Sequence, residues 1–259
     1  MKKLLLGIAA VCLAGFTFAQ DAPLWMRHSV ISPDGTTIAF TYKGDIYTVP
    51  VAGGRAMQIT TNPAYDTAPV WSPDSKRIAF ASDRMGSLDV YIVAKDGGEP
   101  RRLTTHSGSE TPLAFTDAGH VLFSAGIMPS AEAVVFPSNG QFNQVYRVSV
   151  EGGRPTMISS MPMECISINK EGAMLYQDKK GYEDYWRKHH VSPIARDIWM
   201  YTPGKEPQYR QLTTFGGEDR EPVWAPDGKT FYYLSEENGS FNIYRRTPGD
   251  AKAVQLTHY

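Results

Sequence analysis

A turn motif of the Ser-Pro-Asp-Gly type recurs five times along this chain of 259 residues. Each copy joins two short apolar runs; proline in such a turn presets φ, and aspartate can bond the nearby backbone. The copies are Ser32-Pro33-Asp34-Gly35, Ser72-Pro73-Asp74-Ser75, Thr116-Asp117-Ala118-Gly119, Asn169-Lys170-Glu171-Gly172 and Ala225-Pro226-Asp227-Gly228. Repeated strand–turn–strand units of this kind predict an all-β chain.

A second signature, an aliphatic residue followed by threonine or serine, closes each repeat. The closings are Ile59-Thr60-Thr61, Leu103-Thr104-Thr105, Ile158-Ser159-Ser160, Leu212-Thr213-Thr214 and Leu256-Thr257-His258, and they are 44, 55, 54 and 44 residues apart. A period of about 40 to 55 residues built from short strands is typical of a β-propeller with one blade per repeat. The sequence therefore predicts five four-stranded antiparallel blades.

The second repeat shows the four strands of a blade. Apolar runs at 68–72, 77–82 and 89–94 alternate with polar turns, and 100–104 forms a fourth strand whose proline and charges suit an outer edge. The five blades are expected at approximately 24–61, 68–105, 111–160, 164–214 and 221–258, within a propeller region 21–259. Insertions at about 126–142 and 179–196 fall between the second and third strands of blades three and four. They are expected on one face of the disc, which is often the binding face of a repeat protein.

Five blades can close a ring, but repeats of this kind more often form rings of six or seven blades, so we expect an incomplete six- or seven-bladed ring. Such a ring would leave one apolar face of blade one and one of blade five uncovered, a poor arrangement for a soluble chain. We therefore expect the chain to be the N-terminal part of a longer protein, and to aggregate or form homo-oligomers when alone.

Residues 1–20 have the pattern of a secretory signal peptide: Lys2 and Lys3, an apolar run, then the small Ala19. Cleavage after Ala19 or Gln20 predicts a periplasmic or secreted protein. Only Cys165 remains in the mature chain, which excludes an intrachain disulfide. We expect no transmembrane segment in the mature chain.

The formal net charge of −1 argues against a general nucleic-acid surface. Motifs for chemistry are missing as well: there is no Gly-x-Ser-x-Gly elbow, no zinc-type spacing and no phosphate-binding glycine loop. The Gly-Gly pairs at 53–54, 97–98 and 152–153 are interpreted as turns. We assign no catalytic residue, no metal and no cofactor.

The blade-four insertion contains a basic and aromatic cluster. Its members are Trp186, Arg187, Lys188, His189 and His190, which are candidate peptide-binding residues able to capture a peptide carboxylate. Adjacent histidines on a strand point to opposite faces, so joint metal ligation is awkward. A solvated loop with no binding role is the alternative.

Aromatic residues recur at one position in the third strand of every blade. They are Tyr47, Tyr91, Tyr146, Trp199 and Tyr244, and Trp71 and Trp224 precede turn prolines in a similar repeat. Equivalence between blades favours packing between blades over a ligand platform.

Three stretches carry a family resemblance. Asp21–Arg27, Tyr176–His190 and Leu212–Arg220, together with the repeated turns, resemble the opening of bacterial tricorn-type serine peptidases. The repeat alone is shared with TolB-like proteins and with the propellers of prolyl-oligopeptidase-type enzymes, so the blade-four insertion is the more specific part.

The resemblance implies a secreted peptidase in which N-terminal propellers precede a PDZ-like domain and a C-terminal catalytic domain. No position here matches the catalytic residues of that domain. The implied role of this chain is to admit or position peptide or protein substrates. The alternative is a TolB-like periplasmic propeller that binds protein partners without hydrolytic activity.

Overall fold

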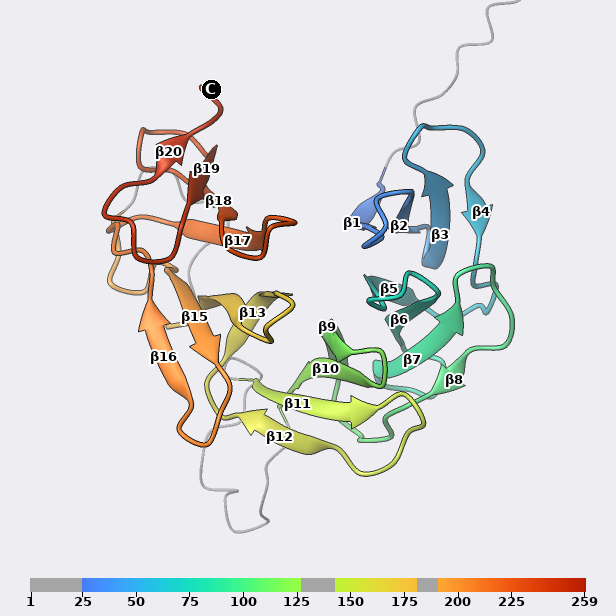
Figure 1. Cartoon of the computed structure of the whole chain (residues 1–259). Helices are drawn as coiled ribbons and strands as arrows, with labels where there is room; N and C mark the ends of the chain where they lie inside the picture. The colour runs from blue at the N-terminus through green and yellow to red at the C-terminus, as the bar shows by residue number, and fades with distance from the viewer. Residues whose placement is uncertain (1–24, 127–142, 181–190) are drawn as a thin grey trace, which may run out of the picture.

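Four-stranded antiparallel sheets repeat around a central axis (Figure 1). The computed structural model describes residues 25–126, 143–180 and 191–259. In these ranges every sheet keeps the strand order of the sequence, with its first strand nearest the axis (Figure 1). The predicted all-β propeller of five four-stranded antiparallel blades is confirmed.

The strands of the first three blades are short, as the sequence predicts. Blade one contains β1 (Arg27–Ile31), β2 (Thr37–Tyr42), β3 (Asp45–Pro50) and β4 (Met57–Gln58). Blade two contains β5 (Asp66–Trp71), β6 (Arg77–Ser82), β7 (Asp89–Ala94) and β8 (Arg101–Arg102). Blade three contains β9 (Glu110–Asp117), β10 (His120–Ala125), β11 (Gln144–Ser149) and β12 (Thr156–Ser159).

The last two blades repeat this pattern. Blade four contains β13 (Met163–Ile168), β14 (Met174–Asp178), β15 (Ile198–Thr202) and β16 (Gln208–Gln211). Blade five contains β17 (Asp219–Trp224), β18 (Phe231–Ser235), β19 (Asn242–Arg246) and β20 (Val254–Gln255). The two predicted insertions fall between β10 and β11 and between β14 and β15, where 127–142 and 181–190 lie outside the described residues.

The repeated turns behave as local hydrogen-bonded units. Asp34 Oδ1 accepts hydrogen bonds from the Ser32 hydroxyl at 2.5 Å and from the backbone N–H of Thr36 at 3.0 Å. Asp74 accepts equivalent bonds in blade two, and Asp227 accepts from the backbone at the blade-five turn. Asp34, Asp74 and Asp227 are therefore turn residues, as predicted.

The core lies between blades, where an aromatic-rich face packs against a face of smaller aliphatic side chains. Between blades one and two, the first face supplies Trp71, Ile78, Phe80 and Tyr91, and the second supplies Ala39, Ile46 and Ile59. The predicted packing role of the third-strand aromatics is confirmed for Tyr91, Tyr146 and Tyr244, which are buried. Tyr47 and Trp199 are half-buried.

Blades one and five stand on either side of an opening in the arc of blades (Figure 1). On the blade-five face beside it, Val223 is 55% exposed and Leu256 is 43% exposed. Leu103 and Leu212 occupy the position of Leu256 in blades two and four, and both are buried against a neighbouring blade. Blade five thus exposes to solvent a surface of the kind that blades two and four bury against a neighbouring blade.

None of the residues in the described ranges forms a helix long and apolar enough to cross a membrane.

Candidate functional site

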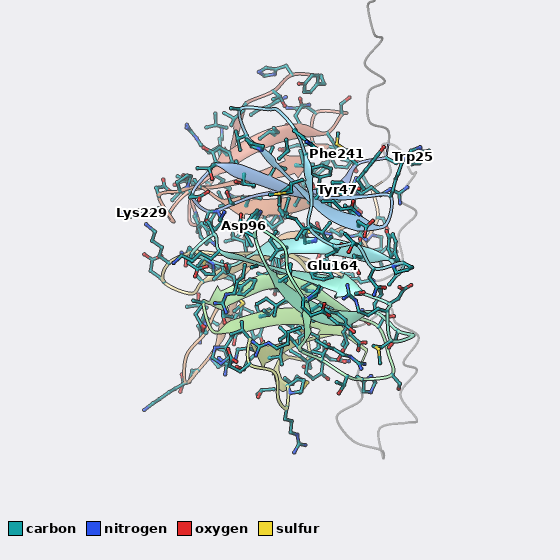
Figure 2. All side chains as sticks on the ribbon, turned by 90° about the vertical axis from the view of Figure 1, so that its right-hand side faces the viewer. Trp25, Tyr47, Asp96, Glu164, Lys229 and Phe241 are labelled. Atoms are coloured by element: carbon teal, nitrogen blue, oxygen red, sulfur yellow. The ribbon has the colours of Figure 1, made fainter. Side chains whose placement is uncertain are left out.

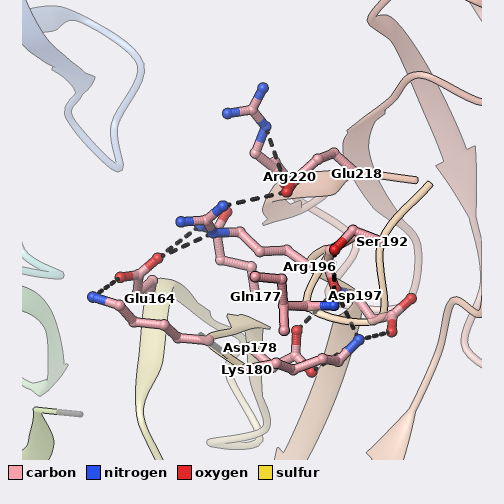
Figure 3. A network of polar contacts seen from close by, with 12 residues as sticks. Glu164, Gln177, Asp178, Lys180, Ser192, Arg196, Asp197, Glu218 and Arg220 are labelled. Carbon is pink, nitrogen blue, oxygen red and sulfur yellow. Dashed lines mark hydrogen bonds and ion pairs between the residues drawn. The ribbon is translucent and has the colours of Figure 1, made fainter. Parts of the chain in front are cut away.

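A network of charged side chains lies at one end of blades four and five (Figure 3). It is drawn from the innermost strands β13 and β17, from the end of β14, and from the residue pair just before β15. Its members, called the charge network below, are Glu164, Gln177, Asp178, Lys179, Lys180, Arg196, Asp197, Glu218 and Arg220.

Arg196 joins the two blades in this network. Its Nε lies 3.4 Å from Glu164 Oε2 in blade four, and its Nη1 lies 3.3 Å from Glu218 Oε1 beside blade five (Figure 3). Lys179 Nζ lies 3.3 Å from the other Glu164 oxygen, and Arg220 Nε lies 3.6 Å from Glu218 Oε2. Each carboxylate is thus shared by two cations.

Lys180 connects a second part of the network. Its ammonium donates to the carboxylate of Asp197 and, at 2.8 Å, to the carbonyl of Ala195, and it lies 3.6 Å from Asp178 Oδ2. Burial alone would lower the pKa of Lys180, but the hydrogen bond to Asp197 and the two nearby carboxylates raise it above its usual value. Lys180 is therefore a fixed positive charge at neutral pH.

Asp178 is nearly buried beneath Lys180. It accepts hydrogen bonds from the backbone N–H of Asp197 at 2.8 Å and from the indole N–H of Trp199 at 3.1 Å. Burial raises the pKa of Asp178, while those hydrogen bonds and the Lys180 charge oppose the rise. Asp178 fixes the start of β15 against the end of β14.

β-Bulges interrupt the pairing of the innermost strands in blades four and five. The pairing of β13 with β14 shifts between Glu164 and Ser167, and Cys165 inside this bulge has φ of 52°. The pairing of β17 with β18 shifts in the same way, and Glu221 there has φ of 53°. His28 and Ala68 have positive φ at the same bulge in the innermost strands of blades one and two, so the bulge is a feature of the repeat rather than of the charge network alone.

Gln177 ties the two bulges together. Its amide donates to Glu164 Oε2 at 3.1 Å, and its carbonyl oxygen accepts from the backbone N–H of Glu221 at 3.0 Å. Desolvation, with the charges of Glu221 and Glu164, raises the pKa of the Cys165 thiol to about 12. Cys165, although exposed at the surface, stays protonated at neutral pH and is a poor nucleophile.

The arrangement can hold charged or polar chain groups. It presents partly exposed charges of both signs, from Glu164 and Lys179. Within the described residues, no group of three or more His, Cys, Asp and Glu side chains could hold a metal ion.

The peptide-binding residues predicted from the sequence, 186–190, lie outside the described residues, so their role stays a prediction. The charge network flanks them in the sequence, with Lys180 before the segment and Ser192 and Arg196 after it. The charge network itself was not predicted from the sequence. The sequence did contain one signal for it. Asp197 occupies the same position in its repeat as Asp45 and Asp89, the aspartates that begin the third strands of blades one and two.

A family model described as the tricorn protease N-terminal beta propeller domain matches residues 23–259. The chain belongs to this family. The match covers all five blades of the tricorn propeller described above, and it confirms the resemblance seen in the sequence.

Curated relatives of this tricorn propeller include peptidases. Tricorn protease homolog 1 of Streptomyces coelicolor is 25% identical over 224 residues, which cover 86% of this chain and 20% of the relative. The uncharacterized peptidase YuxL of Bacillus subtilis is 30% identical over 231 residues, which cover 88% of this chain and 31% of the relative. The chain thus spans from a fifth to less than a third of the length of these relatives.

Solved structures share the fold. The crystal structure of the tricorn protease superposes with a TM-score of 0.72 at 18% identity, over 92% of this chain and 23% of that chain. A putative TolB from Agrobacterium tumefaciens superposes with a TM-score of 0.69 at 15% identity, over 91% of this chain and 82% of that chain. At these identities the likeness concerns the fold alone.

Proposed function

We propose that this chain is the non-catalytic propeller portion of a secreted or periplasmic tricorn-like serine peptidase, and that it admits or positions peptide substrates. The observation that carries the proposal is the match of the tricorn N-terminal propeller family to residues 23–259, with peptidases among the relatives. In this proposal the catalytic groups belong to a separate domain.

The charge network is the proposed contact surface for peptide. A peptide backbone offers donors and acceptors along its length, and its termini and side chains carry charges of both signs. Glu164 and Lys179 supply one fixed charge of each sign, with side chains 33% and 21% exposed. Groups paired in this way can exchange partners with a bound chain at low cost, because partly exposed ion pairs contribute little stability.

The TolB-like alternative, a propeller that binds protein partners without any hydrolytic connection, has fold similarity as its support. Fold similarity does not transfer a function. The family match therefore favours the peptidase-associated role.

The test of the peptidase connection is the sequence of the genomic DNA downstream of the Tyr259 codon. A reading frame that continues into PDZ-like and serine-peptidase segments is the expected result. A stop codon directly after Tyr259 would overturn the proposal and favour a self-contained binding propeller.

A further inference from the structure

A cavity of about 670 Å³ lies between blades one and two, beside the turns that join the third and fourth strands. Its lining includes Thr37, Arg55 and Met57 of blade one and Trp71, Lys95 and Asp96 of blade two. The volume falls within the range of about 300–1,000 Å³ that is usual for ligand sites. Figure 2 shows Asp96 with Lys229 toward the side of the disc away from Trp25.

The cavity arises from two substitutions between repeats. Thr37 and Arg77 occupy the same position in the second strands of blades one and two, because they pair with the last residues of β3 and β7. Met57 and Arg101 occupy the same position in the fourth strands. Where blade two has two arginines, blade one has a threonine and a methionine.

Those two arginines bridge blades two and three at the corresponding position. Arg101 Nη1 lies 2.8 Å from Glu151 Oε2, and its Nη2 donates to the carbonyl of Val150. Arg77 donates across the same interface to the carbonyl of Ala118. Guanidinium groups are therefore the native occupants of this position at the second interface.

The first interface keeps the residues that correspond to the acceptors but has no arginine at either of these two strand positions. The turn after β7 and the turn after β11 have the same hydrogen bond, from the glycine N–H to the carbonyl three residues earlier. Lys95 and Asp96 consequently correspond to Val150 and Glu151. The cavity is thus lined by Lys95 and Asp96, which stand where the carbonyl of Val150 and the carboxylate of Glu151 hold Arg101 one blade further on.

We propose that this cavity binds the side chain of an arginine presented by a peptide or protein partner. The carboxylate of Asp96 and the carbonyl of Lys95 accept from the guanidinium, and its aliphatic stem packs between Met57 and Trp71. This site goes beyond the proposed function: it lies apart from the charge network and does not depend on a peptidase connection.

Two cations of the chain itself compete with the ligand. Lys95 Nζ lies 2.6 Å from Asp96 Oδ1, but their side chains are 47% and 70% exposed, so the pair is weak. A planar guanidinium that forms two parallel hydrogen bonds replaces such an ammonium readily. Arg55 also lines the cavity, and its like charge opposes the ligand.

The experiment titrates the chain with N-acetyl-arginine amide and follows binding by NMR or calorimetry. We expect saturable binding of N-acetyl-arginine amide to the wild-type chain. N-acetyl-norleucine amide should bind at least about fivefold more weakly, because it has no guanidinium to donate hydrogen bonds. Asp96→Asn should weaken the binding of N-acetyl-arginine amide by a similar factor. Arg55→Gln should strengthen this binding.

Met57→Arg is the sharpest variant, because it supplies the side chain that blade two has at this position. It should abolish ligand binding and raise the thermal midpoint, since its guanidinium joins the two blades. Met85→Arg is the matched control: Met85 is exposed in another loop, and its replacement should leave binding unchanged. Absence of saturable binding to the wild-type chain, or equal binding by the Met57→Arg or Asp96→Asn variants, would overturn the proposal.

Discussion

Ile46 and Ile243 occupy the same position in the third strands of blades one and five, yet Ile46 is fully buried and Ile243 is 41% exposed. Both residues accept a hydrogen bond at their carbonyl from the closing signature of their own repeat, at 2.8 Å in each case. The difference is the neighbour: blade two packs on Ile46, whereas Ile243 belongs to none of the buried core clusters that the described residues form.

Truncating the two isoleucines should therefore have unequal effects. Ile46→Ala removes packed methyl groups and should lower the free energy of unfolding by about 2–5 kcal/mol. Ile243→Ala, at an exposed position, should lower it by less than about 1 kcal/mol. Urea unfolding of both variants measures the difference, and equal losses would show that the blade-five face is covered.

The same face predicts association of the chain. Val223, Ile243 and Leu256 form an apolar surface of the kind that other blades bury, and such a patch favours oligomers or aggregates. The double variant Ile243→Lys with Leu256→Lys should reduce association in light scattering, because charges oppose burial of that face. A sharp monomer peak for the wild-type chain would contradict this expectation.

The free energy of unfolding should depend on pH through Glu110. This residue is fully buried at the interface of blades two and three. Burial raises the pKa of Glu110 to about 7, and the charge of Asp89 adds to the rise. The folded state then holds this proton more tightly than the unfolded state, in which the pKa is near 4.5. Stability from this group is fully present below pH 4.5 and falls as the pH rises toward 7.

The loss between those limits should be on the order of 3 kcal/mol. Glu110→Gln cannot ionise, so it should flatten the decline measured by urea unfolding at a series of pH values. Glu151→Gln is the control, because Glu151 is exposed and the Arg101 ion pair holds its pKa below its usual value. An unchanged slope in Glu110→Gln would refute the assignment.

Arg196 should contribute more to stability than a surface cation. Arg196→Gln leaves Glu218, whose side chain is only 4% exposed, with a weaker set of partners, and should cost about 1–3 kcal/mol. Lys95→Gln, which removes an exposed pair with Asp96, should cost less than about 0.5 kcal/mol. Thermal unfolding compares the two, and an Arg196→Gln variant as stable as the wild-type chain would show that the network adds no stability.

Export should remove residues 1–20. Intact-mass analysis of protein from the periplasm or medium should give a mature chain that begins at Gln20 or Asp21, because the apolar run after Lys2 and Lys3 has the form of a signal peptide. Leu5→Arg with Leu6→Arg interrupts that run and should retain the protein in the cytoplasm. A wild-type chain that keeps residues 1–20 after purification would refute the proposed localisation.

The fold was predictable because its determinants are local in the sequence. The hydrogen bond between Ser32 and Asp34 spans two residues, and the turn it stabilises recurs with a period that only a few architectures produce. The equivalence of Tyr91 and Tyr244 across the repeats then assigned both to the core, and the structure confirms both.

The charge network was not predictable in this way because its contacts connect separate blades. Arg196 bridges Glu164 and Glu218, which are 54 residues apart and meet only after two blades have packed together. The arginine cavity was missed for a related reason. It exists because Met57 stands where the next repeat has Arg101, and strand register was needed to make that comparison.

The most direct test of the account is whether the chain binds an extended peptide through the charge network. Fluorescence anisotropy of a labelled, unstructured 12-residue peptide of mixed charge (about 40 Å when extended) should show saturable binding to the chain. Lys179→Gln should weaken it several-fold, whereas Lys229→Gln, in the turn at the other end of the blades, should leave it unchanged. Absence of saturable binding, or equal losses in the two variants, would contradict the peptide-positioning role.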